Sequence, residues 1–274
     1  MSTTVGIATG AGRGMGRACA IRLARTVDVV IGVDLDREGL ASLRQELEGG
    51  TARIESLALD VSDPADMARL AEAVSDLGTL RAVAHAAGIS PTMAEWRRVL
   101  TVDLVGTARL LEALRPLATR DTAFVCFSSM AATLLISGDS PADAPLDDPL
   151  AEEFLALLRE TVGASIEDTG IAYAWAKRGV QRLVRRESVG LGRVGARICS
   201  LSPGMIDTPQ GRQEMGQQPV MQTLLEQTPL GRLGTAGELA AVAAFLLSDE
   251  ASFVTGIDVL VDGGVVAALQ ASRT

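Results

Sequence analysis

The stretch from Val5 to Gly16, V-G-I-A-T-G-A-G-R-G-M-G, constrains the fold of this chain more than any other. An apolar run at 5–8 breaks into a glycine-dense turn at 9–16, and apolar residues at helical spacing follow. Strand, tight glycine turn and helix, in this order, are the context that a dinucleotide-binding loop requires. An ordinary glycine-rich turn between a strand and a helix is the alternative, and the rest of the chain decides between the two.

Three glycines of this turn have separate expected roles. Gly10 permits a turn that a Cβ atom would obstruct, Gly14 lets the backbone approach a pyrophosphate, and Gly16 lets the new helix pack on the sheet. The helix N-terminus also offers unpaired N–H groups and the positive end of a dipole, which favour a phosphate. We therefore predict a cofactor site that includes Thr9, Gly10, Gly12, Arg13, Gly14, Met15 and Gly16.

A second apolar run, 27–33, is closed by Asp34, followed by Leu35. An acid at this distance from the glycines suits hydrogen bonds from the adenosine ribose hydroxyls, and its charge repels a 2′-phosphate. Asp34 therefore favours NAD over NADP as the cofactor, although Arg13 and Arg37 partly offset the repulsion. A solvated strand end is the alternative interpretation of Asp34. At the end of the third apolar run we expect Asp60 and Val61 to extend the same site.

Apolar runs of strand length alternate with amphipathic helical patterns along the whole chain. Continuous apolar strands are typical of a parallel sheet that helices cover on both faces. The predicted fold is therefore α/β: a single-domain, Rossmann-like, doubly wound parallel sheet spanning residues 1–274. Ser62 is the expected N-cap of the helix through Met67, Leu70 and Val74. The further predicted strands are 54–59, 80–84, 123–127, 196–201 and 257–261, and the clearest helices are 36–48 and 95–114.

Residues 138–149, G-D-S-P-A-D-A-P-L-D-D-P, are the one shift in composition. Prolines and acids at this density cannot continue a strand or helix. We predict an excursion from the sheet at 130–169 rather than a domain boundary, because the alternation of strands and helices resumes after it. Long excursions of this kind in compact domains are often lids or binding loops.

Charge and composition exclude several classes of function. The formal net charge of −9 argues against nucleic acid or an anionic membrane surface as a partner. The single histidine, His85, rules out a multi-histidine metal site, and we expect no bound metal. The three cysteines, Cys19, Cys126 and Cys199, each lie in an apolar run and indicate buried thiols in a reducing compartment. No apolar stretch reaches the length of a membrane span, and no signal peptide is recognisable, so we expect a cytoplasmic protein.

The segment I-A-Y-A-W-A-K places Tyr173 and Lys177 four residues apart on one helical face. With this pair, the chain resembles the short-chain dehydrogenase/reductase family over essentially its whole length. The matching motifs are T-G-x-x-x-G-x-G at Thr9, Gly10, Gly14 and Gly16, the serine after the fifth strand at Ser129, Y-x-x-x-K at Tyr173 and Lys177, P-G-x-x-x-T at Pro203, Gly204 and Thr208, and the V-D-G-G segment within 258–264.

The chemistry of these residues makes independent sense. Oxidising an alcohol by hydride transfer needs a base for the hydroxyl proton, and a phenol with a pKa near 10 is a poor base at neutral pH. A neighbouring ammonium, Lys177, favours the phenolate of Tyr173 and should lower its pKa. Ser129 can hold the substrate oxygen in line with the phenol, and Ser128 is the alternative for this role. No other tyrosine in the chain can serve as the base, because Tyr173 is the only one.

The resemblance implies further cofactor contacts. Lys177 would also hydrogen-bond the nicotinamide ribose, and Thr208 would bind the carboxamide or phosphate. Residues 205–229 would form the substrate lid. The remaining cofactor residues implied in this way are Ala86, Ala87, Gly88, Tyr173, Pro203, Gly204 and Ile206.

Two positions depart from the family pattern. Asp103 stands where the family carries an asparagine thought to anchor a water that links the lysine to solvent. Asp103 can accept hydrogen bonds from the same water, so we include it with Ser129, Tyr173 and Lys177 among the candidate catalytic residues. Its charge should raise the pKa of Lys177, and its own pKa should be perturbed if it is buried. His85, in H-A-A-G, replaces the first residue of the family's N-N-A-G. A catalytic role for His85 is possible, but a histidine at a strand end is more often a hydrogen-bonded structural residue.

The pocket walls that the resemblance implies are apolar and lack an arginine or lysine that would bind a carboxylate or phosphate. We therefore predict a hydrophobic, uncharged secondary alcohol or ketone as substrate, such as a steroid or terpenoid; the alternative is that these residues only pack the lid. The excursion before Tyr173 resembles that of some bacterial NAD-dependent hydroxysteroid dehydrogenases. The expected substrate residues are Ser129, Met130, Trp175 and Met205, with Leu134 and Ile206 alongside.

Two further expectations concern the role and assembly of the chain. An NAD-binding regulatory or redox-sensing protein is the alternative to an enzyme, because a fold does not fix a function. The family resemblance implies a homo-tetramer, with the helix at 95–114 and the helix after Lys177 as interfaces. Four arginines follow Lys177 on that helix, and we interpret them as a solvated or subunit-facing surface: Arg178, Arg182, Arg185 and Arg186.

Overall fold

A seven-stranded sheet with the order β3-β2-β1-β4-β5-β6-β9 runs through the structure, a computed structural model that describes residues 2–134 and 138–272. Each neighbouring pair of strands in this sheet is parallel. The predicted doubly wound α/β fold is therefore confirmed. The strands are β1 (Thr4–Thr9), β2 (Val29–Asp34), β3 (Arg53–Ala58), β4 (Thr79–His85), β5 (Ala123–Phe127), β6 (Arg197–Pro203) and β9 (Asp258–Val261).

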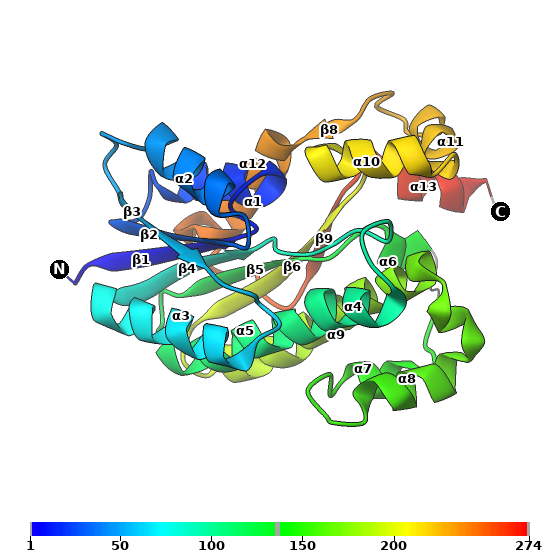
Figure 1. Cartoon of the computed structure of the whole chain (residues 1–274), viewed down its shortest axis with the longest axis horizontal. Coiled ribbons are helices and arrows are strands. Elements are labelled where there is room, and N and C mark those ends of the chain that lie inside the picture. The colour runs from blue at the N-terminus through cyan, green and yellow to red at the C-terminus, as the bar shows by residue number, and fades with distance from the viewer. Residues whose placement is uncertain (1, 135–137, 273–274) are drawn as a thin grey trace.

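Helices cover both faces of the sheet (Figure 1). One face is packed by α1 (Gly14–Leu23), α2 (Arg37–Glu46) and α12 (Ala236–Leu247). The other is packed by α3 (Pro64–Leu77), α5 (Gly106–Leu114) and the long α9 (Thr169–Gly192). The central strands β1, β2, β4, β5 and β6 are mostly buried and mainly apolar, as the sequence predicts, whereas the edge strands β3 and β9 are only partly buried. The three cysteines are free and buried, also as predicted.

The strand order reverses beside β1, which pairs with β2 on one side and β4 on the other. In open α/β sheets, ligands bind outside the carboxyl ends of the strands at such a reversal. The glycine turn follows β1 at this edge, and the segments that follow β4, β5 and β6 also begin there. The topology thus gathers the motifs identified in the sequence at one edge of the sheet.

Two local predictions differ from the structure. The N-cap of α3 is Asp63, whose carboxylate accepts from the N–H groups of Ala65 and Asp66, and not Ser62. Ser62 instead donates to the carboxylate of Asp60, 2.6 Å away, so its hydroxyl is already engaged outside the helix. The helix predicted at 95–114 is also divided: α4 (Trp96–Leu100) is followed by one π-helical segment, η1 (Thr101–Val105), and then by α5.

The excursion between β5 and α9 folds into short helices. After α6 (Ala131–Leu134), residues 135–137 of the predicted excursion lie outside the described residues. The segment continues through α7 (Asp143–Leu146), α8 (Phe154–Val162) and η3 (Ala164–Glu167). The excursion joins the same apolar core as α3, α5 and α9, through buried residues such as Leu146 and Leu158.

Two of the four arginines on α9 bind the acidic part of this excursion. Arg178 makes a bidentate pair with the buried carboxylate of Asp143, at 2.5 and 2.6 Å, and Arg182 binds Asp147 at 2.6 and 2.8 Å. Arg182 also lies 3.3 Å from Asp143. The interpretation of these arginines as a solvated or subunit-facing surface is therefore wrong for Arg178 and Arg182, because their charges are paired within the chain.

This pairing predicts that Asp143→Ala destabilises the excursion. Removing the carboxylate takes away two charged hydrogen bonds of the Arg178 guanidinium, and we expect a loss of about 2 kcal/mol in the free energy of unfolding. Limited proteolysis should then cut within 138–149 faster than in the unmodified protein. Asp148→Ala is the matched control, because Asp148 is exposed and no side-chain hydrogen bond holds it within the described structure. Equal cleavage rates for the two variants would contradict the prediction.

The segment predicted as a lid leaves the sheet after β6. Its two ends are joined by a small parallel pair, β7 (Ile206–Asp207) with β8 (Gly234–Thr235). Between them lie α10 (Pro209–Gln217) and α11 (Val220–Glu226), beside the C-terminal helix α13 (Val265–Ala271) in Figure 1. None of the helices in the described ranges is both long and apolar enough to cross a membrane.

Candidate active site

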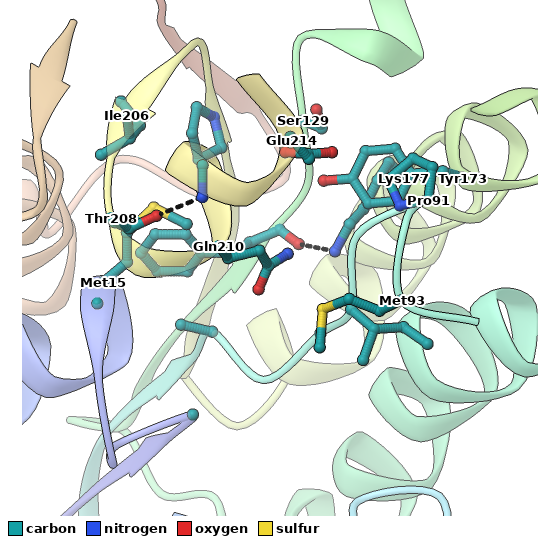
Figure 2. Close-up of a pocket in the computed structure, with 18 of the residues that line it drawn as sticks. Met15, Pro91, Met93, Ser129, Tyr173, Lys177, Ile206, Thr208, Gln210 and Glu214 are labelled. Atoms are coloured by element: carbon teal, nitrogen blue, oxygen red, sulfur yellow. Dashed lines mark hydrogen bonds between the residues drawn. The ribbon is translucent and has the colours of Figure 1, made fainter. Parts of the chain in front are cut away.

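A cavity of about 840 Å³ opens at the carboxyl edge of the sheet, between the glycine turn and α10. Figure 2 shows side chains from α9, α10 and the loop after β4 converging on it. Most of the predicted cofactor residues line this cavity, so the motifs that are far apart in sequence share one cleft. They are Gly10, Arg13, Gly14, Met15, Gly16, Asp34, Leu35, Asp60, Val61, Ala86, Ala87, Gly88, Tyr173, Lys177, Pro203, Gly204, Ile206 and Thr208.

Two predicted cofactor residues, Thr9 and Gly12, lie behind the wall of the cavity. Thr9 is fully buried, and its hydroxyl accepts from the N–H of Ala87 at 3.0 Å. The N–H of Gly12 donates to Asp34 at 2.9 Å. Neither residue faces the cavity. Each one fixes, through a hydrogen bond, the position of a neighbouring residue that does line it.

The glycine turn has the shape that a phosphate-binding loop needs. Gly10 and Gly14 have φ angles of +67° and +59°, which residues other than glycine rarely adopt. A Cβ atom at Gly16 would lie 2.2 Å from the carbonyl oxygen of Gly10, so α1 packs directly against the turn. The N-terminus of α1 thus points at an open backbone cradle in the cavity wall. These residues fit a nucleotide phosphate.

Asp34 ends β2 with its carboxylate held by two backbone groups. Oδ2 accepts from Gly12 and Oδ1 accepts from Asp36, each at 2.9 Å. Each carboxylate oxygen has lone pairs left for a further donor. Arg13 lines the same cavity, whereas Arg37 is exposed outside it. Of the two arginines expected to offset the charge of Asp34, only Arg13 faces the site.

His85 is a hydrogen-bonded structural residue rather than a member of the cavity wall. Its Nε2 lies 3.0 Å from the hydroxyl of Thr107, and its Nδ1 lies 2.8 Å from the hydroxyl of Thr9. Thr107 donates its only hydroxyl proton to the carbonyl of Asp103, so it must accept from His85 Nε2–H. Nδ1 then accepts from Thr9, and the ring is neutral. Burial lowers the pKa of His85 to about 3, in agreement with this assignment.

This arrangement predicts an acid-dependent loss of stability at His85. The unfolded chain takes up a proton here below about pH 6.5, whereas the folded chain does so only near pH 3. The contribution is therefore complete above pH 6.5 and decreases as the pH falls, by about 2 kcal/mol at pH 5. Urea unfolding at pH 7.5 and pH 5 should show a smaller decrease for His85→Gln than for the unmodified protein. The same decrease in the free energy of unfolding between the two pH values in both proteins would contradict a neutral buried ring.

Lys177, which lines the cavity, forms a buried pair with Asp103, which lies behind the cavity wall. Lys177 Nζ lies 3.6 Å from Asp103 Oδ2 and donates to the carbonyl of Phe127 at 3.2 Å. Asp103 Oδ1 accepts from the N–H of Ile89 at 2.8 Å, while Oδ2 has no hydrogen-bond partner in the described ranges. A Cβ at Gly88 would lie 2.9 Å from Asp103 and 3.2 Å from Lys177, so a glycine is needed beside the pair. Burial raises the pKa of Asp103, as expected, and Lys177 opposes that shift.

The π-helical segment places Asp103 where it can reach Lys177. Segments of π-helix inside α-helices are uncommon and often occur at functional sites. Asp103 lies at the middle of η1, fully buried, and η1 packs against α9. The carboxylate at this position therefore acts on the site through Lys177, without lining the cavity.

The expected lowering of the Tyr173 pKa is not what the structure shows. Burial raises the pKa of the phenol above its ordinary value, and the carboxylates of Asp103 and Glu214 raise it further. A side-chain hydrogen bond with Ser129 acts in the opposite direction. The lysine ammonium lies 5.4 Å from the centre of the Tyr173 ring, but its charge is balanced by Asp103. The prediction considered the lysine charge and not the burial of the phenol, which is the largest cause of the raised pKa.

Asp103→Asn should therefore make the phenol of Tyr173 more acidic. The substitution removes one cause of the raised pKa and leaves the Lys177 charge unbalanced, and both effects favour the phenolate. In the pH dependence of kcat/KM for alcohol oxidation, the rise that reports a phenol should move to lower pH. Thermal melting confirms that the variant is folded. A rise that stays in place, or moves to higher pH, would contradict the electrostatic role of Asp103.

The two adjacent serines have different surroundings. Ser128 is buried and its hydroxyl donates to the carbonyl of Lys177 at 2.9 Å. Both serines line the cavity, but the Ser129 hydroxyl is the one that bonds the Tyr173 phenol, which lies near it in Figure 2. Ser129 is thus the serine whose hydroxyl can reach a ligand next to the phenol, and Ser128 fixes α9 against the end of β5.

Two of the four expected substrate residues do not line the cavity. Trp175 points into the apolar core beneath α9, with the Arg178 guanidinium 5.9 Å from its ring centre. On α9 it lies two residues from Tyr173, which places it on another side of the helix. Met205 is buried under the lid, in a cluster with Met130, Val265 and Val266. Met130 does line the cavity, as do Leu134 and Ile206.

Glu214 is a site residue that sequence reasoning missed. It lies on α10 and lines the cavity with its carboxyl toward Ser129 and Tyr173 (Figure 2). Burial raises its pKa to about 7, Asp103 adds to this shift, and Lys177 opposes it. The only signal in the sequence was an acid within the Gln- and Met-rich segment, which by itself looks like a solvated charge.

Comparison with known proteins agrees with this geometry. A family model described as enoyl-(acyl carrier protein) reductase matches residues 10–143 and 157–266. A short-chain dehydrogenase/reductase of Alternaria brassicicola is 35% identical over 278 residues, covering 98% of this chain and 98% of that protein. Levodione reductase of Leifsonia aquatica is 31% identical over 278 residues, covering 95% and 93%. A crystal structure of levodione reductase superposes with a TM-score of 0.76 at 30% identity, covering 97% and 98%.

The chain belongs to the short-chain dehydrogenase/reductase family. It is an oxidoreductase of alcohols or ketones that uses a nicotinamide cofactor, as members of this family do.

Proposed function

We propose that this enzyme interconverts hydrophobic secondary alcohols and ketones with NAD(H), and that Tyr173 is its general acid and base. The observation that carries the proposal is the shared cavity, which brings Ser129, Tyr173 and Lys177 to the glycine turn and Asp34. A bound nicotinamide supplies or accepts the hydride. The residues of the chain then have to orient the substrate oxygen and move its proton.

Ser129 and Tyr173 divide this work. The Ser129 hydroxyl orients the substrate oxygen beside the phenol, and Tyr173 exchanges a proton with that oxygen. Because the pKa of Tyr173 is raised, the neutral phenol dominates at neutral pH, and this is the form that donates a proton to a ketone. Lys177 is the positioning charge next to the ring and would hold the nicotinamide ribose.

Asp34 supports NAD as the cofactor over NADP. Its carboxylate lies at the cavity wall, where it can accept from ribose hydroxyls and would repel a 2′-phosphate. The apolar wall supports a steroid- or terpenoid-like substrate, since Met130, Leu134, Met221 and Leu224 line the end of the cavity beneath the lid. We further propose that the enzyme works in the cytoplasm as a homo-tetramer.

Tyr173→Phe tests the proposal. The variant keeps the aromatic ring and removes the hydroxyl that exchanges the proton, so we expect kcat for alcohol oxidation to fall by at least about a hundredfold. The affinity for NAD should stay within about twofold of that of the unmodified enzyme. The readouts are NADH absorbance and calorimetric NAD binding. A panel of cyclic, charged and sugar alcohols, each with NAD and with NADP, defines the substrate class.

Three outcomes would overturn parts of this proposal. Turnover confined to charged or sugar alcohols contradicts a hydrophobic substrate, and better turnover with NADP contradicts the role of Asp34. NAD binding without turnover of any alcohol or ketone would favour a regulatory or redox-sensing protein. Full activity of the Tyr173→Phe variant would show that Tyr173 is not the general acid and base.

A further inference from the structure

Glu214 differs from the other acids that line the cavity. Asp34 and Asp36 each accept backbone N–H groups, and Asp60 binds Ser62 and Arg98. The Glu214 carboxyl has neither a hydrogen bond nor an ion pair within the described part of the chain. An acid held in a largely apolar cavity without a partner has a desolvation cost that a bound donor would offset.

The neighbouring cations are engaged elsewhere. Arg212, on the same helix, pairs with Asp207 at 2.5 Å and is mostly exposed. Lys177 faces Glu214 across the cavity from α9, but it is bound to Asp103 and to the carbonyl of Phe127. The remaining titratable group that faces Glu214 is the phenol of Tyr173. No hydrogen bond to this carboxyl is therefore present within the described residues, and the Tyr173 hydroxyl is engaged with Ser129.

The position of Glu214 indicates where such a donor would come from. In Figure 2 its carboxyl points toward the Tyr173 phenol, whose pKa it raises, and Ser129 lines the same cavity; these two residues hold the reacting oxygen in the proposed function. A ligand oxygen bound by Ser129 and Tyr173 would therefore have the carboxyl as its immediate neighbour. A carboxylate there attracts a hydroxyl on the adjacent carbon and repels a substrate carboxylate.

We propose that Glu214 determines specificity by accepting a hydrogen bond from a second hydroxyl of the substrate, on the carbon next to the one that reacts. This inference rests on the proposed function, because it takes the position of the reacting carbon from Ser129 and Tyr173. The part of the wall on α11 is mainly apolar, with Val220, Met221 and Leu224 beside Thr223. The substrate class is therefore a hydrophobic vicinal diol, or the matching hydroxyketone in the direction of reduction.

A pair of matched alcohols tests the role of Glu214. Tetralin-1,2-diol and 1-tetralol share a hydrophobic two-ring body and differ only in the second hydroxyl. With NAD, kcat/KM of the unmodified enzyme should be at least about tenfold higher for the diol, because a hydrogen bond to a charged group has about this effect. Glu214→Leu should reduce kcat/KM for the diol by about ten- to a hundredfold, mainly through KM, and change that for 1-tetralol by less than about threefold.

Two variants serve as controls. Glu214→Gln keeps an acceptor oxygen of the same size and should retain part of the diol preference. Glu226→Leu changes an exposed acid of α11 that does not line the cavity, and it should leave both substrates unaffected. Calorimetric titration of each alcohol into enzyme with NADH measures binding separately from turnover, and it should show the same loss for the diol alone.

The outcomes separate this inference from the proposed function. Equal losses for both alcohols in Glu214→Leu would overturn the inference and make Glu214 part of the proton transfer or of the lid packing. Oxidation of 1-tetralol without any preference for the diol would overturn it while the proposed function stands. Failure of the unmodified enzyme to oxidise any alcohol, or to reduce any ketone, would overturn the proposed function and the inference with it.

Discussion

The buried pair between Asp103 and Lys177 is the interaction on which the rest of the site depends. A buried ammonium needs a counter-charge or hydrogen bonds, and here the carboxylate and the Phe127 carbonyl provide them from two other elements. A π-helical segment and a glycine at position 88 make room for this contact. The same carboxylate raises the pKa of Tyr173. The protein thus stabilises its lysine at the cost of a less acidic phenol.

The fold could be predicted almost completely from the sequence. Glycine spacing after the first strand, continuous apolar strands and the alternation with helices allow few other architectures, and β5 was placed at its observed ends, Ala123–Phe127. The predictions that were wrong concern local features of single helices. The N-cap of α3 moved from Ser62 to Asp63, because Ser62 hydrogen-bonds Asp60 instead. Helical periodicity cannot distinguish a π segment from continuous α-helix, so η1 was not foreseen.

The site residues that belong to recognisable sequence motifs could be predicted. Residues whose role depends on the backbone, such as Gly10 and Gly14, lie at the cavity as expected. Residues whose role depends on partners were harder to predict. Trp175 was assigned to the pocket by its position in the family pattern, although its direction on α9 places it in the core. Glu214 was missed because burial, which raises its pKa, is a property of the folded lid and not of the sequence around it.

The excursion at 138–149 is attached to the same helix that carries Tyr173 and Lys177. Arg178 directly follows Lys177 in the chain and binds Asp143, and Arg182 binds Asp147 one turn later. The segment is therefore joined to α9 at two defined anchor points. For redesign of this enzyme, this means that any segment grafted here has to present two carboxylates with the same spacing, together with the apolar side chain at position 146 that lies between them in the core.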